Sequence, residues 1–210
     1  MTVHVGSTEQ PRRRRGGVRP SRPTPRYRLV VLAAGAGDVV QSAGGWLADR
    51  ALAGWDIEVL VAVSDDGAAD TRALQILGAT VGELGAALDT TLDTGPVAAV
   101  AVAAELFTAD ARVRDRVLHA YDRDIAEITV WGREIPGELN ARFQGVEHVL
   151  SAAAQAFKQH SLTALSCAGH VCATEGFRAG ARRGIGNDLT PIGEVYIADD
   201  AVRGRAGGQG

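Results

Sequence analysis

The chain is poor in several residue types that mark particular protein classes. Its 210 residues include only two cysteines, Cys167 and Cys172, which excludes a disulfide framework. No uncharged apolar run reaches about 18 residues, so the sequence excludes a membrane-spanning helix. It also shows no collagen-like period, no heptad array and no internal repeat of about 20–50 residues, which excludes fibrous and solenoid folds. Lysine is nearly absent too, since Lys158 stands against 21 arginines, a bias that we attribute to GC-rich coding rather than to chemistry.

What is present is the composition of an ordinary globular domain, with 46% apolar and 22% charged residues. The net charge of −3 conceals a split: residues 1–26 hold seven arginines and one acid, about +6, and the rest of the chain carries about −9. Four of the seven prolines also lie in this stretch. We therefore predict a disordered basic arm over 1–26, one α/β domain over 27–200 and a flexible tail over 201–210, in a cytoplasmic protein.

Hydrophobic patterning predicts a strand–helix–strand unit at the start of the domain. Continuous apolar runs at 28–34 and 57–63 are typical of parallel strands buried on both faces. Between them, apolar residues recur at spacings of three and four, and Gly54 is placed to end that helix. Further helices are predicted at 143–157 and 170–183, and the proline at the start of 96–106 favours one there. The pattern predicts a three-layer, Rossmann-like α/β fold with a mostly parallel sheet.

The turns that follow the two strands supply the candidate ligand pocket, because α/β sheets bind ligands at the carboxyl ends of their strands. The first turn has a Gly-x-Gly pattern, which lets a backbone approach a phosphate, but it lacks the third glycine of the full fingerprint and carries an acid that repels phosphate. A tight turn with a helix cap is the alternative interpretation. The pocket candidates from the two turns are Gly35, Gly37, Asp38, Asp65 and Asp66.

The order of features over residues 28–79 resembles the LmbE-like (PIG-L) zinc-dependent N-acetylglucosaminyl deacetylases. That family opens with an apolar strand, a Pro-His-Pro-Asp-Asp-Glu turn, a Gly-Gly helix start, an Ala-Gly helix end and a strand closing in Thr-Asp-Gly. This chain has Ala34-Gly-Ala-Gly-Asp-Val39, then Gly44-Gly45, Ala53-Gly54 and Asp66-Gly67 at the corresponding places. The resemblance implies the family's α/β fold.

The same resemblance implies a metal site that has largely been lost. The family's turn supplies a histidine and the second aspartate as zinc ligands and the first aspartate as general base. Here the histidine position is Gly35, the base position is Gly37, and only the ligand Asp38 is retained. His170 lies about where the family places its third ligand. Two ligands fall short of the three that a catalytic zinc ion needs, and no base is assigned unless Asp65 or Asp66 substitutes for it.

A second candidate metal cluster lies later in the chain. Cys167, His170 and Cys172 bring thiol and imidazole groups, which zinc prefers, within six residues, and Asp38 would be a fourth ligand if the family fold applies. Buried cysteines and a hydrogen-bonded histidine are the structural alternative.

Three functions stay open from the sequence. The leading hypothesis is a non-catalytic LmbE-like homologue that binds a small molecule or a protein partner, with no cofactor. The second is a zinc-dependent amide hydrolase, a deacetylase with altered ligands. The third is an accessory nucleic-acid-binding protein that contacts phosphates through Arg12, Arg13, Arg14 and Arg15. A homo-oligomer is compatible with all three.

Overall fold

A computed structural model describes residues 26–62, 67–167, 170–180 and 189–191, and it has one central β-sheet in this part of the chain. The sheet has eight strands in the order β3-β2-β1-β4-β5-β7-β6-β8. In chain order the strands are β1 (Arg28–Ala33), β2 (Asp56–Val61), β3 (Ala79–Glu83), β4 (Ala99–Ala103), β5 (Glu127–Trp131), β6 (Phe143–Val149), β7 (Thr174–Gly180) and β8 (Thr190–Pro191).

Strand direction divides the sheet into two parts. The first five strands in the spatial order, β3 to β5, pair in parallel. The pairs β5–β7, β6–β7 and β6–β8 are antiparallel. Strand β1 lies between β2 and β4, so the chain leaves β1 toward one side of the sheet and later returns to its other side. This reversal of strand order is where ligands bind in doubly wound sheets.

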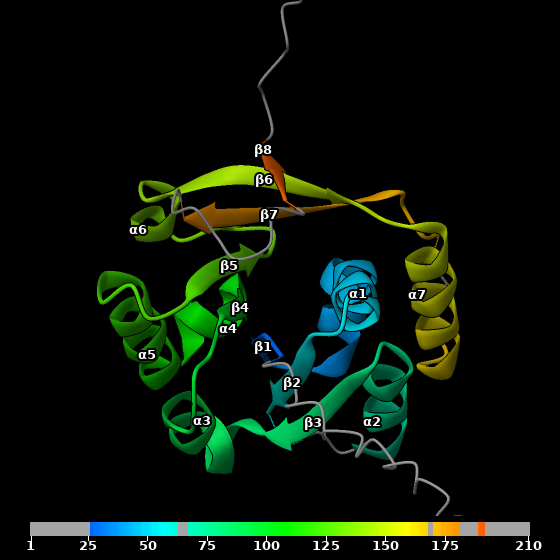
Figure 1. The fold of residues 1–210 in the computed structure, drawn as a ribbon, viewed down its shortest axis with the longest axis horizontal. Helices are drawn as coiled ribbons and strands as arrows, with labels where there is room; N and C mark the ends of the chain where they lie inside the picture. Colours follow the sequence, from blue (N-terminus) through cyan, green and yellow to red (C-terminus); the bar gives the residue numbers. More distant parts are fainter. Residues whose placement is uncertain (1–25, 63–66, 168–169, 181–188, 192–210) are drawn as a thin grey trace, which may run out of the picture.

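Helices cover both faces of the sheet, which makes three layers (Figure 1). On one face, α1 (Ala36–Leu52), α2 (Gly67–Ile76) and α7 (Ala152–Ala164) pack against one another. On the other face lie α3 (Leu84–Asp93) and α5 (Ala111–Asp122), with α4 (Ala104–Ala109) beside α5, and α6 (Gly137–Asn140) leads into β6. The predicted α/β fold with a mostly parallel sheet is confirmed.

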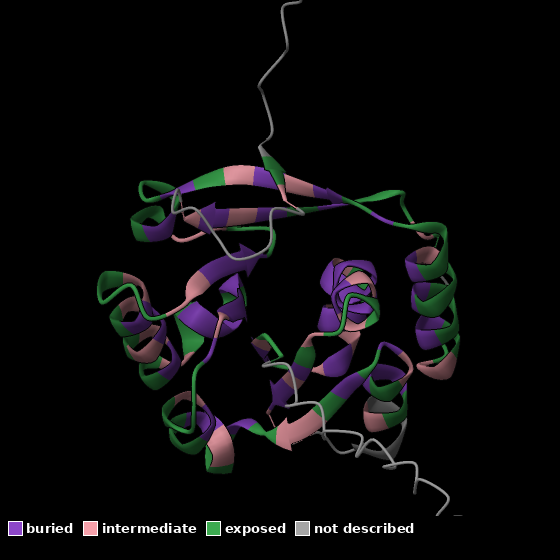
Figure 2. Ribbon diagram, in the orientation of Figure 1, coloured by how far each residue is buried: buried purple, intermediate pink, exposed green. Residues whose placement is uncertain are grey.

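The core lies between these layers and is deepest around β1 and α1. Every residue from Leu29 to Ala33 is fully buried. Most of α1 is buried as well, whereas α5 and α7 show exposed outer faces (Figure 2). The carboxyl end of β1 and the first turn of α1 therefore rest on rigid, well-packed elements, which suits a site that must hold its geometry.

The predicted opening unit is confirmed. Strand β1, helix α1 and strand β2 follow one another as expected, and α1 stops at Leu52 with Gly54 in the left-handed region at φ +87°. Glycine adopts that conformation without the steric cost that a side chain would add.

Three helix predictions are wrong over much of their length, although 152–157 lie in α7 and 104–106 lie in α4. Residues 143–149 form β6 rather than the start of a helix, and 174–180 form β7 where a helix was expected from His170 onward. Residues 99–103, in the stretch where proline favoured a helix, form β4 between β1 and β5. In each case pairing with a neighbouring strand outweighs the local spacing of apolar residues.

The arginine arm, the tail over 201–210, Asp65 and Asp66 lie outside the described residues. No helix in the described part of the chain is both long and apolar enough to cross a membrane.

Candidate functional site

A pocket of about 600 Å³ opens at the carboxyl ends of β1, β4 and β5. Asp38 lies in the first turn of α1 after β1, Glu105 lies in α4 after β4, and Arg133 lies in the loop after β5. Three charged side chains from separate parts of the chain thus lie at one edge of the sheet. Residues of α7 and of the start of β7 also line the pocket. The further lining residues are Gln41, Ser42, Trp131, Gly132, Lys158, Leu162, Cys167, His170, Cys172, Thr174, Glu175 and Gly176.

Asp38 is held in place by neutral donors. It lies in the first turn of α1, where a negative charge suits the positive end of the helix dipole. The indole Nε1 of Trp131 donates to Asp38 Oδ2 at 2.9 Å, and Ser42 Oγ donates to Oδ1 at 3.1 Å. These hydrogen bonds orient both carboxylate oxygens of Asp38. Among the described residues, no cationic side chain forms an ion pair with this carboxylate.

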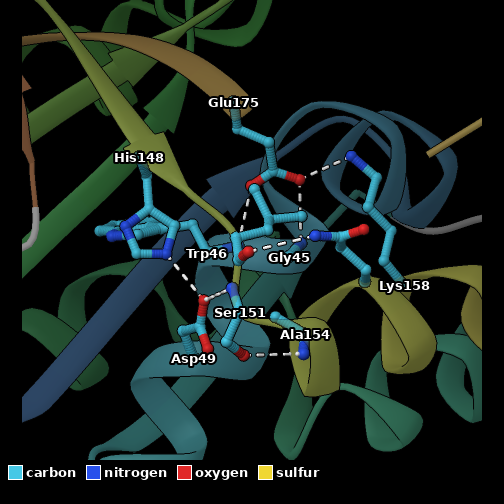
Figure 3. Close-up of polar contacts among 10 residues, drawn as sticks. Gly45, Trp46, Asp49, His148, Ser151, Ala154, Lys158 and Glu175 are labelled. Carbon is cyan, nitrogen blue, oxygen red and sulfur yellow. Dashed lines mark hydrogen bonds and ion pairs between the residues drawn. The ribbon is translucent and has the colours of Figure 1, made fainter. Parts of the chain in front are cut away.

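Two of the residues that line the pocket, Lys158 and Glu175, form a buried ion pair (Figure 3). Lys158 Nζ of α7 lies 2.6 Å from Glu175 Oε1 of β7, and the two side chains are only 5% and 3% exposed. Glu175 also accepts hydrogen bonds from the backbone N–H groups of Gly45 and Trp46 in α1, at 2.9 and 2.8 Å. Lys158 donates at 2.6 Å to the carbonyl of Gln41, the group that normally accepts from Gly45 in a helix. The pair thus fastens α7 and β7 to the middle of α1.

The two glycines of α1 allow this close approach. A Cβ atom on Gly45 would lie 1.9 Å from Cδ2 and 2.5 Å from Cγ of Leu150, and 3.2 Å from Glu175 Oε1. A Cβ on Gly44 would make only ordinary contacts, the nearest at 3.4 Å to Leu77. The Gly-Gly pair noted in the sequence therefore has a packing role here. Of the two positions, only Gly45 has no room for a Cβ atom.

A second polar clamp joins α1 to the turn between β6 and α7 (Figure 3). Asp49 Oδ2 lies 2.8 Å from His148 Nε2 and accepts from the backbone N–H of Ser151 at 3.1 Å. Ser151 caps α7 by accepting from the N–H of Ala154. Burial alone would raise the pKa of Asp49, but the hydrogen bonds from Ser151 and His148 outweigh it and lower that pKa below its ordinary value.

We expect Asp49→Asn to lower the free energy of unfolding at pH 7 by about 1–2 kcal/mol, since the hydrogen bonds to a charged acceptor are lost. The folded-state pKa of Asp49 is depressed, so its contribution is complete above the unfolded-state value near 4 and is lost as the pH falls through the folded-state pKa. In denaturant titrations from pH 7 to pH 2, the free energies of unfolding of the wild type and of Asp49→Asn should become equal at acid pH. Asp115→Asn, at an exposed site in α5, is the matched control. A difference in free energy of unfolding between the wild type and Asp49→Asn that stays constant down to pH 2 would refute this role for Asp49.

The structure brings four of the predicted site residues to one pocket. Asp38, Cys167, His170 and Cys172 all line it, although His170 lies in the loop between α7 and β7 and not at the start of a helix. Gly35 and Gly37 are adjacent to Asp38 in the chain but are not among the lining residues. Neither position is crowded, because a Cβ on either glycine would meet nothing within 4 Å.

These donors do not assemble into a metal centre. Within residues 26–62, 67–167, 170–180 and 189–191, no three His, Cys, Asp or Glu side chains are grouped so as to hold one ion. A catalytic zinc ion needs three protein ligands that converge on it. The described residues therefore do not fit the zinc ion that the family resemblance implies, and metal binding by Asp38, His170 and the two cysteines stays a prediction.

Sequence reasoning missed four residues that define the pocket: Glu105, Arg133, Lys158 and Glu175. Glu105 follows β4, which was not predicted as a strand, and Arg133 follows β5, which was. Lys158 lies one residue beyond the predicted helix over 143–157, and Glu175 lies in β7, where a helix was predicted. One signal was visible, since Lys158 is the only lysine in a chain that otherwise uses arginine.

Comparison with known proteins gives a likeness of fold. No protein-family model matches the chain, and no curated protein matches its sequence. Among solved structures, a deacetylase of the teicoplanin biosynthetic pathway, in complex with teicoplanin, is similar at TM-score 0.54 and 14% identity, covering 72% of this chain and 97% of the other. The A40926 pseudoaglycone deacetylase Dbv21 gives 0.53 at 15% identity, covering 74% and 97%. The 4-carboxy-2-hydroxymuconate hydratase GalB of Pseudomonas putida KT2440 gives 0.50 at 15% identity, covering 77% and 99%. The chain thus has the α/β fold that these deacetylases share with a hydratase.

Proposed function

We propose that this chain is a divergent LmbE-like protein that binds a small polar molecule in the carboxyl-edge pocket and does not carry out metal-dependent hydrolysis. The observation that carries the proposal is the make-up of the pocket. It gathers charged and hydrogen-bonding side chains from five elements or their adjoining loops, yet within the described residues it brings no three metal donors together. A concave site with a few fixed polar groups is the usual form of a small-molecule site.

The two glycines before Asp38 support the non-catalytic interpretation. Gly35 has extended backbone angles, φ −159° and ψ 159°, and Gly37 lies in the first turn of α1. Open space surrounds both positions, and neither has a positive φ. The backbone would therefore accept a histidine and an aspartate there, so folding does not require glycine at the two positions where the resembled family has a zinc ligand and a base.

The proposal is tested by filling the pocket. Gln41 of α1 lines it at an exposed position three residues after Asp38, and its backbone carbonyl, not its side chain, accepts from Lys158. Gln41→Trp therefore adds bulk on the pocket side of α1 and keeps that hydrogen bond. Gln159→Trp is the matched control, because Gln159 is exposed in α7 and does not line the pocket. Ligand-observed NMR with a library of polar metabolites should detect binders to the wild type and to Gln159→Trp, with at least tenfold weaker binding to Gln41→Trp. Absence of any binder, or binding that Gln41→Trp leaves unchanged, would overturn the proposal.

A further inference from the structure

A second cavity of about 430 Å³, here called the β7 hollow, adjoins the carboxyl-edge pocket at β5, β7 and β6. The two cavities share the lining residues Trp131, Gly132, Arg133 and Gly176. The other residues that line the β7 hollow are Val130, Ile135, Gly145, Phe177 and Arg178. Its lining therefore contains two arginines and no aspartate or glutamate, unlike that of the carboxyl-edge pocket.

Arg178 faces away from α1, on the opposite side of the sheet from the buried ion pair. Glu175 accepts hydrogen bonds from backbone N–H groups of α1, so its side chain faces that helix (Figure 3). Side chains alternate between the two faces along a strand, so positions 176 and 178 of β7 face the other side. A Cβ at Gly180, two residues beyond Arg178, would lie 2.7 Å from Tyr121 of α5. Helix α5 thus covers this face at Gly180.

Two glycines beside Arg178 leave space on the same face. Gly145 of β6 is the register partner of Arg178, and Gly176 precedes it by two residues in β7. Neither glycine has a positive φ, and a Cβ at Gly176 would meet nothing within 4 Å. Neither the backbone nor the packing of the described residues therefore requires glycine at position 176. A glycine inside a strand often marks a place where a ligand approaches closely.

The charge of Arg178 has no counter-ion among the described residues. Its side chain is half-buried, and no ion pair or hydrogen bond ties its guanidinium group to this part of the chain. Arg133 is exposed and adds a second positive charge to the same lining. The nearby acid is Glu105, which accepts a long hydrogen bond of 3.5 Å from the Arg133 backbone N–H but does not line the β7 hollow.

We propose that the β7 hollow binds an anionic oxygen group, a carboxylate or a phosphate, through the guanidinium group of Arg178. Guanidinium presents a planar set of N–H donors that fits both groups, and a cavity lined by arginines without acids favours an anion over a cation. The volume of about 430 Å³ suits a small organic acid or phosphate ester. This site goes beyond the proposed function, because Arg178 and the Lys158–Glu175 pair lie on opposite faces of β7.

The test is a titration of the full chain with inorganic phosphate and, separately, with malonate, both at constant ionic strength set with sodium chloride. Saturable shifts of the protein N–H signals in NMR spectra report binding. We expect at least one of the two anions to bind, and Arg178→Gln to weaken that binding at least about tenfold, because a charge-assisted hydrogen bond is lost. Arg123→Gln is the matched control, since Arg123 is exposed and lies outside the hollow.

A second variant fills the hollow and keeps the arginine. Gly176→Leu places its side chain on the same face as Arg178, at a position where a Cβ meets nothing. It should weaken anion binding at least about tenfold by excluding the anion. Gly137→Leu is its control, because Gly137 is equally open and does not line the hollow, and it should leave binding unchanged.

The outcomes separate this site from the proposed function. Binding of phosphate alone supports a phosphate ester as ligand, and binding of malonate alone supports a carboxylic acid. No saturable binding of either anion, or binding that Arg178→Gln leaves unchanged, would overturn the inference. Anion binding should persist in Gln41→Trp, which fills the other cavity. If Gln41→Trp abolishes it, the anion binds in the carboxyl-edge pocket, and this inference is wrong while the proposed function stands.

Discussion

Replacing Lys158 with methionine should lower the free energy of unfolding by about 3–5 kcal/mol, the usual cost of leaving one member of a buried ion pair alone. Glu175 would lose its ammonium partner at 3% side-chain exposure, and the Gln41 carbonyl would lose its ammonium donor. The effect should appear in denaturant unfolding at pH 7 as a lower midpoint with an unchanged slope.

A double variant shows whether the unpaired charge causes this loss. Lys158→Met combined with Glu175→Gln removes both charges and keeps one acceptor oxygen for the two backbone N–H groups of Gly45 and Trp46. We expect it to be more stable than Lys158→Met alone by about 1–3 kcal/mol. A single variant that loses less than about 1 kcal/mol, or a double variant no better than the single, contradicts the role given to this pair.

Gly45→Ala should destabilise the protein by about 1–3 kcal/mol, although alanine favours helices over glycine by up to about 1 kcal/mol. The reason is steric, because the added Cβ would overlap Leu150, whose side chain is 4% exposed and has little room to move. The residue before it provides the matched control. Gly44→Ala adds only ordinary contacts in the same helix, so it should leave stability unchanged or raise it by a few tenths of a kcal/mol.

Thermal and denaturant unfolding of these two variants gives a direct comparison within one turn of α1. Equal effects at the two positions would show that helix propensity, and not the approach of Leu150, decides stability there. A stabilised Gly45→Ala variant would show that the turn between β6 and α7 does not pack on α1 as described.

The sequence was sufficient where one local signal decided the structure. The buried apolar runs of β1 and β2, the helical spacing between them and the stop at Gly54 are each encoded within a short window. The second half could not be predicted in the same way. Phe143 and Val146 happen to fit a helical spacing, but they are buried in β6 because β7, about thirty residues later, pairs with it.

The candidate site was predictable in part for the same reason. Asp38 was found because it follows a strand that local pattern identifies, and ligands bind at that edge. Lys158 and Glu175 could not be paired from the sequence, because their partnership depends on α7 and β7 packing on the same turn of α1. Lys158 stands out in the sequence as the single lysine, but the sequence does not indicate that Glu175 is its partner.

We propose that the carboxyl-edge pocket binds a small polar molecule without a metal ion. Native mass spectrometry of the untagged full chain can test this binding, on protein incubated with the best binder and recorded before and after chelation of divalent metals. We expect a one-to-one complex that survives chelation, is lost in Gln41→Trp and carries no stoichiometric zinc. A complex that dissociates on chelation, or one equivalent of zinc that disappears in Asp38→Asn, would contradict it.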